Sequence, residues 1–271
     1  MTGTEFDHTS LATRAAGPWL SRVTRELGAT VVMGEEVPGF RYVMCRVGPW
    51  DGCSGLELME PRPGTGRNFL SRFLDTHGEG PHHLTFVVPA LEETIRDAER
   101  LGLRLVQTDL TNPRWRETFV VPDPTHGVVI QIADTTSPAP DVSALATGKR
   151  DTGSLPLHRL GSDRAWWEPH VRDPVRTATL VSTTLRSTDL ACSHRLFADV
   201  LGGHPRRLAD GAVEFTWARG TLVVEPASTP GVSHLSIADG PVGGFTVVGT
   251  PCRGDEITRL TTDRRSRRRS R

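Results

Sequence analysis

Hydrophobic and polar positions follow the same order twice in the first half of the chain. A strand-like run comes first, an apolar spacing typical of an amphipathic helix follows, and three more strand-like runs complete the unit. In the first unit these runs cover 6–13, 19–27, 30–33, 40–47 and 55–60. In the second unit they cover 83–88, 91–101, 103–108, 117–121 and 128–133. The pattern predicts two copies of one βαβββ unit, joined by a short helix over 68–74.

The pattern weakens in the second half of the chain. Residues 136–176 are rich in Pro, Ser, Gly, Ala and Asp and are interpreted as a surface linker, part of which Trp166 and Trp167 pin to a domain. A third unit follows, and a fourth starts at 231–239 without a recognisable closing strand. The predicted organisation is a first domain at 1–135, a linker at 136–176, a degenerate second domain at 177–263 and a disordered basic tail at 264–271.

Composition narrows the functional classes. The 271 residues have a formal net charge of +0, so the bulk of the chain does not match nucleic acid electrostatically. No apolar run approaches the roughly 18–20 residues that span a bilayer, and the N-terminus lacks the features of a secretory signal. The four cysteines are scattered without a Cys-x-x-Cys pair, which favours reduced, structural thiols. We therefore expect a cytoplasmic protein with a small-molecule partner and neither a nucleic-acid nor a membrane partner.

Four polar residues fall into register when the first two units are superposed. His8 and His83 start the first strand of each unit, and Glu57 and Gln131 lie in each last strand, 49 and 48 positions further on. Two copies of one unit that each offer a histidine and an oxygen donor predict one metal ion held between the copies. Taken singly, a histidine at a strand start is often a hydrogen-bonded core residue, Glu57 could lie on a solvated edge, and Gln131 could mark a site that has lost its metal.

The stretch RNFLSRFLDTHGEGPHHLTFVV at 67–88 carries a family resemblance. Together with the repeated units, it resembles the methylmalonyl-CoA epimerase branch of the vicinal oxygen chelate superfamily, which also contains glyoxalase I, bleomycin-resistance proteins and extradiol dioxygenases. The resemblance implies an α+β fold in which paired βαβββ modules form curved-sheet cups, with two such domains in this chain. It places the metal ligands at His8, Glu57, His83 and Gln131. Strand alternation then predicts that His82 points to the face opposite His83.

The chain departs from the epimerase pattern in two places. The epimerases usually supply Gln from the first module and Glu from the second, whereas this chain has Glu57 first and Gln131 second. The epimerases also place a Glu on the middle strand of the first module, near Tyr42 here, and the symmetry-related strand carries Glu117. We therefore hypothesise mirrored chemistry with Glu57, Glu117 and Tyr42 as catalytic candidates. The simpler interpretation of Glu117 is a polar strand residue.

The resemblance implies a metal-dependent isomerase, epimerase or lyase that acts through an enolate on a small carbonyl compound or acyl thioester. One divalent transition metal, Zn²⁺, Ni²⁺, Co²⁺, Mn²⁺ or Fe²⁺, suits two imidazoles with a carboxylate and an amide oxygen. One alternative is an Fe(II) dioxygenase that uses His8, His83 and Glu57. Another is a metal-free cup that binds an antibiotic or other planar ligand. The walls of that cup would be Trp19, Trp50 and Trp115.

The second domain is expected to hold no catalytic metal. Ser182, Leu222 and His234 are assigned to the positions of His8, Glu57 and His83, and one histidine with a leucine cannot bind one. The second domain is then structural or lines the rim of the first cup. The four modules form either a self-sufficient monomer or a homodimer.

Overall fold

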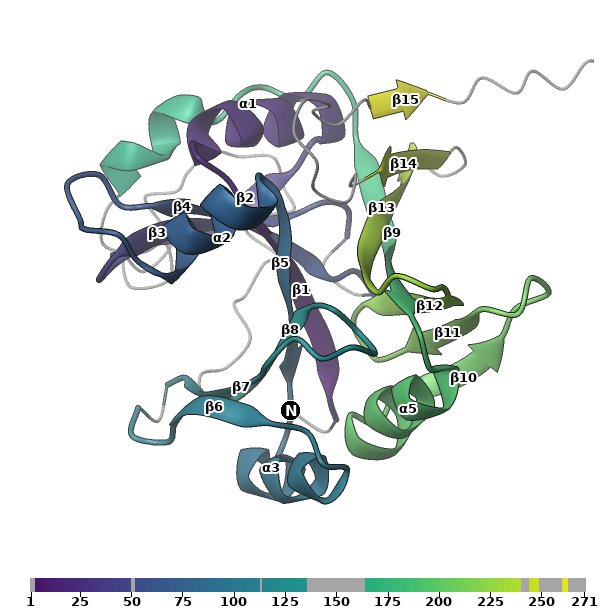
Figure 1. Cartoon of the computed structure of the whole chain (residues 1–271). Helices are drawn as coiled ribbons and strands as arrows, with labels where there is room; N and C mark the ends of the chain where they lie inside the picture. The colour runs from purple at the N-terminus through teal and green to yellow at the C-terminus, as the bar shows by residue number, and fades with distance from the viewer. Residues whose placement is uncertain are drawn as a thin grey trace, which may run out of the picture.

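The computed structural model describes residues 3–49, 52–112, 114–135 and 164–239, together with the strands at 244–248 and 260–262. The first domain contains these elements in order: β1 (Glu5–Ala12), α1 (Ala16–Leu27), β2 (Thr30–Val37), β3 (Phe40–Arg46), β4 (Gly55–Pro61), α2 (Phe69–His77), β5 (Gly80–Val87), α3 (Leu91–Arg100), β6 (Leu105–Asp109), β7 (Arg116–Val120) and β8 (Val129–Asp134). Both predicted βαβββ units are present, with the predicted short helix between them (Figure 1).

One eight-stranded sheet unites the two modules. Its order is β2-β3-β4-β1-β5-β8-β7-β6, so the first strand of each module lies at the centre. β1 pairs in parallel with β4, β5 pairs in parallel with β8, and β1 and β5 meet antiparallel. This arrangement relates the modules by a pseudo-twofold axis between β1 and β5. The α+β fold of paired modules is therefore confirmed.

Helix α1 illustrates how local sequence positions the sheet. Its apolar stripe buries Leu20, Val23 and Leu27 against the outer face of the first module. The helix ends at Gly28, which adopts a left-handed conformation (φ 65°) that glycine tolerates without steric cost. The backbone then turns directly into β2.

The end of the predicted linker forms two short helices, η3 (Arg164–Trp166) and η4 (Glu168–His170). The second domain contains β9 (Ala178–Ser187), α5 (Leu190–His194), η5 (Arg195–Val200), β10 (His204–Arg207), β11 (Val213–Thr216), β12 (Thr221–Pro226), β13 (Gly231–Asp239), β14 (Gly244–Val248) and β15 (Leu260–Thr262). Its sheet has the order β10-β11-β12-β9-β13-β14-β15. The third module repeats the βαβββ order. The fourth differs, because β13 pairs antiparallel with the next strand, β14, and its described part contains no helix.

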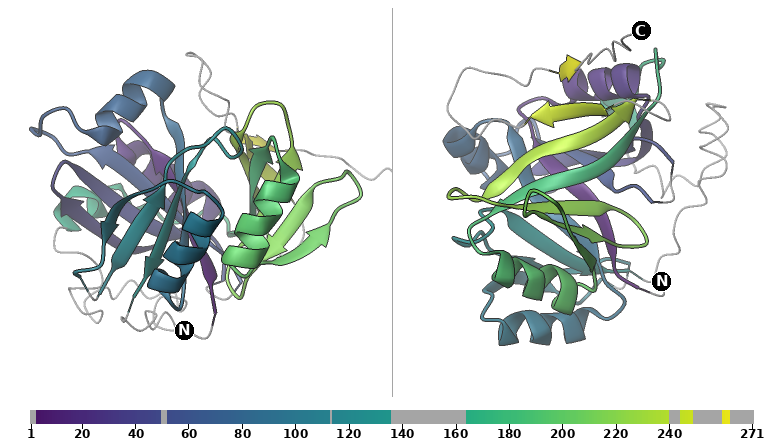
Figure 2. Two further views of the ribbon diagram at one scale, coloured as in Figure 1. Left: turned by 60° about the horizontal axis from the view of Figure 1, so that its bottom comes forward. Right: turned by 90° about the vertical axis from the view of Figure 1, so that its right-hand side faces the viewer.

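The two domains pack back to back (Figure 2). Phe6 and Phe86 of the two central strands share one core with Phe197, Phe215 and Trp217 of the second domain. The Oγ1 atoms of Thr9 and Thr183 lie 2.7 Å apart across the interface. Thr9 separates His8 and Ser10 on β1, whose side chains point to the other face of the sheet. The described part of the second domain therefore covers the back of the first sheet and does not line the rim of its cup.

The segment 164–176, at the end of the predicted linker, is docked on the first domain. Trp167 is buried among the side chains that surround α1, and its ring occupies the space that a Cβ atom on Gly34 would need. Ser21 of α1 donates a hydrogen bond to the carbonyl oxygen of His170 (2.8 Å). The rest of the linker, the basic tail, Trp50 and Cys252 lie outside the described residues.

Two further findings bear on the composition-based expectations. Cys45, Cys53 and Cys192 are free thiols, and Cys45 and Cys53 are buried. Among the described residues, no helix is long and apolar enough to cross a membrane.

Candidate metal centre

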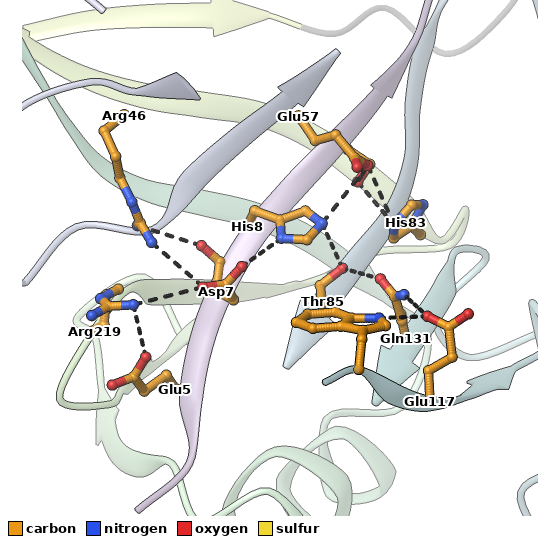
Figure 3. A network of polar contacts seen from close by, with 12 residues as sticks. Glu5, Asp7, His8, Arg46, Glu57, His83, Thr85, Glu117, Gln131 and Arg219 are labelled. Carbon is orange, nitrogen blue, oxygen red and sulfur yellow. Dashed lines mark hydrogen bonds and ion pairs between the residues drawn. The ribbon is translucent and has the colours of Figure 1, made fainter. Parts of the chain in front are cut away.

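Three buried side chains converge on the concave face of the first sheet (Figure 3). His8, Glu57 and His83 each present a possible ligand atom, and these atoms lie within 4.8 Å of one another. The Nε2 atoms of both histidines are 3.7 Å from Oε2 of Glu57. The convergence follows from the sheet order, because Ser10 pairs with Glu57 on one side of β1 and with His83 on the other.

A β-bulge precedes each of the two histidines. Relative to its partner strand, β1 has one extra residue between Phe6 and His8, which is Asp7, and β5 has one extra residue between Pro81 and His83. Asp7 Oδ2 lies 2.7 Å from Nδ1 of His8. A partner at Nδ1 fixes the ring and leaves Nε2 to face the site, as in metal-bound histidines generally.

His82 is the extra residue of the second bulge. Its Nδ1 lies 2.9 Å from Nδ1 of His83, so it plays for His83 the part that Asp7 plays for His8. The expectation that His82 points away from His83 is therefore wrong, because the bulge breaks the strict alternation of β5. Burial and the neighbouring His77 lower the pKa of His82 to about 4, so the ring is neutral at pH 7.

Gln131 joins the site through Thr85. Its Oε1 accepts a hydrogen bond from Oγ1 of Thr85 (2.6 Å), and that hydroxyl lies 2.9 Å from Nε2 of His8. Its Nε2 donates to Oε2 of Glu117 (2.6 Å), which also accepts a bond from Nε1 of Trp115 (2.7 Å). Glu117 thereby holds the Gln131 amide with its oxygen toward the histidines. The structure thus brings all four predicted ligands into one network.

The electrostatics of the cluster suit a bound cation. The pKa of His83 lies well below its usual value, mainly because the ring is buried and to a smaller extent because His82 and His8 are close. This imidazole is therefore neutral and able to donate a lone pair. Burial raises the pKa of Glu57, against the opposing effects of His8 and Ser10. Ser10 Oγ donates to Oε2 of Glu57 (2.5 Å) and lies 2.9 Å from Nε2 of His83. Two imidazoles and one buried carboxylate fit a divalent transition metal.

The Asp7 carboxylate is itself held between charges. Burial alone would raise its pKa, but the hydrogen bond from His8 and the charges of His8, Arg46 and Arg219 outweigh burial and hold the pKa well below its usual value. Nδ1 of His8 therefore faces an anionic partner, Asp7, whereas Nδ1 of His83 faces a neutral partner, His82.

Tyr42 and Glu117 occupy equivalent places on the two walls of the cup. Tyr42 pairs with Met59, two positions beyond Glu57 on β4, and Glu117 pairs with Ala133, two positions beyond Gln131 on β8. The predicted symmetry relation between Tyr42 and Glu117 therefore agrees with the strand register.

Sequence reasoning missed one acidic residue of this face, Glu35 on β2. The Tyr42 hydroxyl donates to Oε2 of Glu35 (3.1 Å). Burial, followed by the charges of Glu35 and Glu57, raises the pKa of Tyr42, so the phenol stays protonated. The signal that could have found Glu35 is its pairing with Tyr42 across the hairpin, because two strands joined by a tight turn place such residues opposite each other.

The described part of the second domain repeats the scaffold but keeps only one of the three clustered ligand residues, His234 in the place of His83. Thr184 pairs with His234 as Ser10 pairs with His83, and Ser233 is an extra bulge residue whose Oγ lies 3.0 Å from Nδ1 of His234. The register also corrects one assignment. Val223 pairs with Thr184 as Glu57 pairs with Ser10, so Val223 and not Leu222 stands in the place of Glu57. The position is apolar in either case and supplies no carboxylate.

Residues 7–120 match the family model described as the Glyoxalase/Bleomycin resistance protein/Dioxygenase superfamily. The match lies within the first domain and covers most of it. Superfamily members usually bind a divalent metal, and His8, Glu57 and His83 form the possible site for one here. A search of curated proteins finds no match to the chain.

Several solved structures are similar to about half of the chain. A hypothetical protein from Bacillus halodurans is 21% identical, with 51% of this chain and 99% of that chain covered and a TM-score of 0.44. A variant of Streptomyces coelicolor methylmalonyl-CoA epimerase in complex with 2-nitronate-propionyl-CoA is 24% identical, with 50% and 100% covered and a TM-score of 0.43. Methylmalonyl-CoA epimerase from Mycobacterium tuberculosis is 25% identical, with 53% and 97% covered and a TM-score of 0.42.

Proposed function

We propose that the first domain is a metal-dependent isomerase, epimerase or lyase that moves a proton beside the carbonyl group of a small carbonyl compound or acyl thioester. The observation that carries the proposal is the convergence of Nε2 of His8, Nε2 of His83 and Oε2 of Glu57, with a bulge residue at Nδ1 of each histidine. A contact at Nδ1 orients each imidazole ring so that its Nε2 atom faces the site, which is what two histidine ligands of one metal ion require.

His8, Glu57 and His83 would hold the ion, with Oε1 of Gln131 as a fourth donor. A divalent cation bound there would supply Lewis-acid polarisation of a substrate carbonyl oxygen. Zn²⁺, Ni²⁺, Co²⁺, Mn²⁺ and Fe²⁺ all accept such a mixed nitrogen and oxygen donor set. The Thr85 hydroxyl would keep the Gln131 oxygen directed at the site.

The proton would be handled from the two walls of the cup. Glu117 on β7 offers a carboxylate as base, and its hydrogen bonds from Gln131 and Trp115 fix its position. On the opposite wall, the Tyr42 hydroxyl, which donates a hydrogen bond to Glu35, can give a proton to a substrate carbon and regain one from solvent. Groups on two faces of a planar intermediate are what an epimerisation requires.

The proposed substrate class follows from the ligands of similar proteins. Methylmalonyl-CoA epimerases that are similar to the first domain have been solved in complex with methylmalonyl-CoA and with 2-nitronate-propionyl-CoA. These ligands belong to those proteins, and they make acyl-CoA thioesters the first compounds to offer to this one.

The test is elemental analysis of the purified protein beside two variants. His83→Ala removes a proposed ligand, and His204→Ala removes an exposed histidine of β10 as a matched control. We expect about one equivalent of a transition metal in the wild type and in His204→Ala, and none in His83→Ala. The loaded protein should then exchange the proton beside the thioester carbonyl of methylmalonyl-CoA with solvent deuterium, read by NMR. Iron with oxygen uptake would favour the dioxygenase instead, and no metal after reconstitution would leave a ligand-binding cup.

A further inference from the structure

The second domain reaches the back of the metal centre through one arginine. Arg219 lies in the turn between β11 and β12, and its Nη1 is 2.8 Å from Oε2 of Glu5 and 3.7 Å from Oδ1 of Asp7. Arg46 of the first domain approaches the same Asp7 oxygen, with its Nη2 at 3.4 Å. The other carboxylate oxygen, Oδ2, faces Nδ1 of His8 (Figure 3).

The turn that carries Arg219 is fixed to the bulge by its backbone as well. The Phe6 N–H donates to the Arg219 carbonyl oxygen (3.0 Å), and Arg219 forms a β-bridge with Gly52. Gly220 follows in a left-handed conformation (φ 83°), and a Cβ atom there would come within 2.5 Å of the Phe6 carbonyl oxygen. Only glycine permits this approach. The guanidinium and the backbone thus contact Glu5, Phe6 and Asp7, the three residues that enter the bulge before His8.

We infer that Arg219 of the second domain is a positioning residue for the metal centre of the first. It acts through Asp7, whose carboxylate it holds against Nδ1 of His8 so that Nε2 faces Glu57. The second domain, in which Val223 replaces the carboxylate of Glu57, would then serve to complete the other domain's site. This inference rests on the proposed metal binding, and it also makes a statement about the metal-free protein, namely that Nδ1 of His8 carries a proton and donates it in a hydrogen bond to Asp7.

The direction in which Arg219→Gln changes the affinity for a metal ion distinguishes a positioning role from simple electrostatics. Replacement of Arg219 by glutamine removes a positive charge near the site, and by Coulomb attraction alone this would tighten the binding of a cation. Loss of positioning acts in the opposite direction, because a partner removed from behind a metal ligand typically weakens metal affinity about 10–100-fold. Weaker binding in the variant therefore reports lost positioning.

The experiment compares the full-length wild type with Arg219→Gln, Asp7→Ala and the double variant. Arg206→Gln is the matched control, because Arg206 pairs with Glu214 at the edge of the second sheet, within its own domain. Arg219→Lys keeps the charge and the backbone contacts. This variant replaces Arg219→Gln in both measurements if the glutamine variant does not fold. Co²⁺ affinity is measured by competition with a chelator. The tautomer of His8 in the metal-free protein is read from long-range ¹H–¹⁵N NMR spectra.

We expect Arg219→Gln to weaken Co²⁺ binding about tenfold and to shift His8 toward a mixture of tautomers, while Arg206→Gln matches the wild type. The double variant should bind Co²⁺ no more weakly than Asp7→Ala alone, because both changes interrupt one path. Unchanged or tighter binding with an unaltered His8 tautomer in Arg219→Gln would overturn the inference, as would additive losses in the double variant. A wild type that binds no metal would sink the proposed function, and the tautomer comparison would still decide the role of Arg219.

Discussion

At the scale of single residues, the site depends on where the proton of each imidazole lies. Asp7 and His82 both enter as extra residues in strands, and each meets Nδ1 of the histidine that follows it. Each bulge turns the residue before a histidine so that its side chain contacts the imidazole ring of that histidine. The same device at Ser233 and His234 survives in a domain that has lost the carboxylate.

Glu117 gives the first prediction at this scale. Glu117→Gln removes the proposed base and one acceptor of the Gln131 amide, so turnover should fall at least about 100-fold, the usual contribution of a positioned acid or base. Metal content should stay near that of the wild type, because His8, Glu57 and His83 are untouched. Rate and metal content are measured beside Glu93→Gln, an exposed change on α3. Unchanged turnover with metal retained would remove Glu117 from the mechanism.

Cys45 gives a second prediction. It is fully buried under α1, and burial raises the pKa of its thiol to about 12, from 9.0. In the unfolded chain the thiol ionises first, so the folded state holds more protons above pH 9. The stability from the neutral thiol is complete below pH 9 and is lost as the pH rises toward about 12. Urea unfolding of the wild type at pH 8 to 10.5 should show this decline, with a slope that approaches about 1.4 kcal/mol per pH unit above pH 9. Cys45→Ala should show a shallower decline, and an equal slope in the two proteins would contradict the assignment.

At the scale of elements, regular periodicity was predictable and its interruptions were not. The units of the first domain follow from apolar spacing and from punctuating residues such as Gly28 and Pro61. The strand β10 has four exposed residues and no alternation, so no apolar pattern marks it. The position of His82 depends on a bulge, which is set by pairing with β1 and leaves no period in the sequence of β5 alone.

The candidate site divides in the same way. The convergence of the four candidate positions was predictable because the same polar positions recur in both copies of one unit. Whether these residues bind a metal stays a prediction. Glu35 was missed because its role comes from contact with Tyr42 across a hairpin rather than from any repeat. The backing of His8 by Arg219 joins positions more than 200 residues apart in the chain. Only the packing of the two domains reveals it.

The docked segment around Trp167 provides the prediction at this scale. Trp167 is 3% exposed and packs into the core that surrounds α1. Trp167→Ala should cost about 3–5 kcal/mol of unfolding free energy, as large buried aromatic side chains do. Gly34→Ala should also destabilise the protein, because its new Cβ atom would meet the Trp167 ring. Urea denaturation measures both, with Val181→Ala on an exposed site as control. A loss below about 1 kcal/mol for Trp167→Ala would show that the segment is not anchored there.

At the scale of the whole molecule, the two domains share one core and should unfold together. Phe6 and Phe86 come from the first sheet, and Phe197 and Phe215 come from the second domain. The ring centroids of Phe86 and Phe197 are 5.9 Å apart, and those of Phe197 and Phe215 are 5.6 Å apart. A second contact supports the same interface, because His126 Nε2 of the first domain lies 3.1 Å from Oγ of Ser193 on α5, with both residues buried. Neither domain can open fully without exposing the apolar face of the other.

The last prediction follows from that coupling. A metal bound at His8, Glu57 and His83 stabilises the native state only, by about 2.7 kcal/mol at a free concentration 100 times the Kd. Because the core is continuous, strand β12 of the second domain should gain protection from amide hydrogen exchange along with β1, although β12 lies behind the site and offers no ligand. Exchange is followed by mass spectrometry in mild urea, with and without Zn²⁺, in the wild type and in His83→Ala. Protection confined to the first domain would mean that the domains open independently. Protection of both domains, absent in His83→Ala, would mean that the binding energy of one metal stabilises the whole chain.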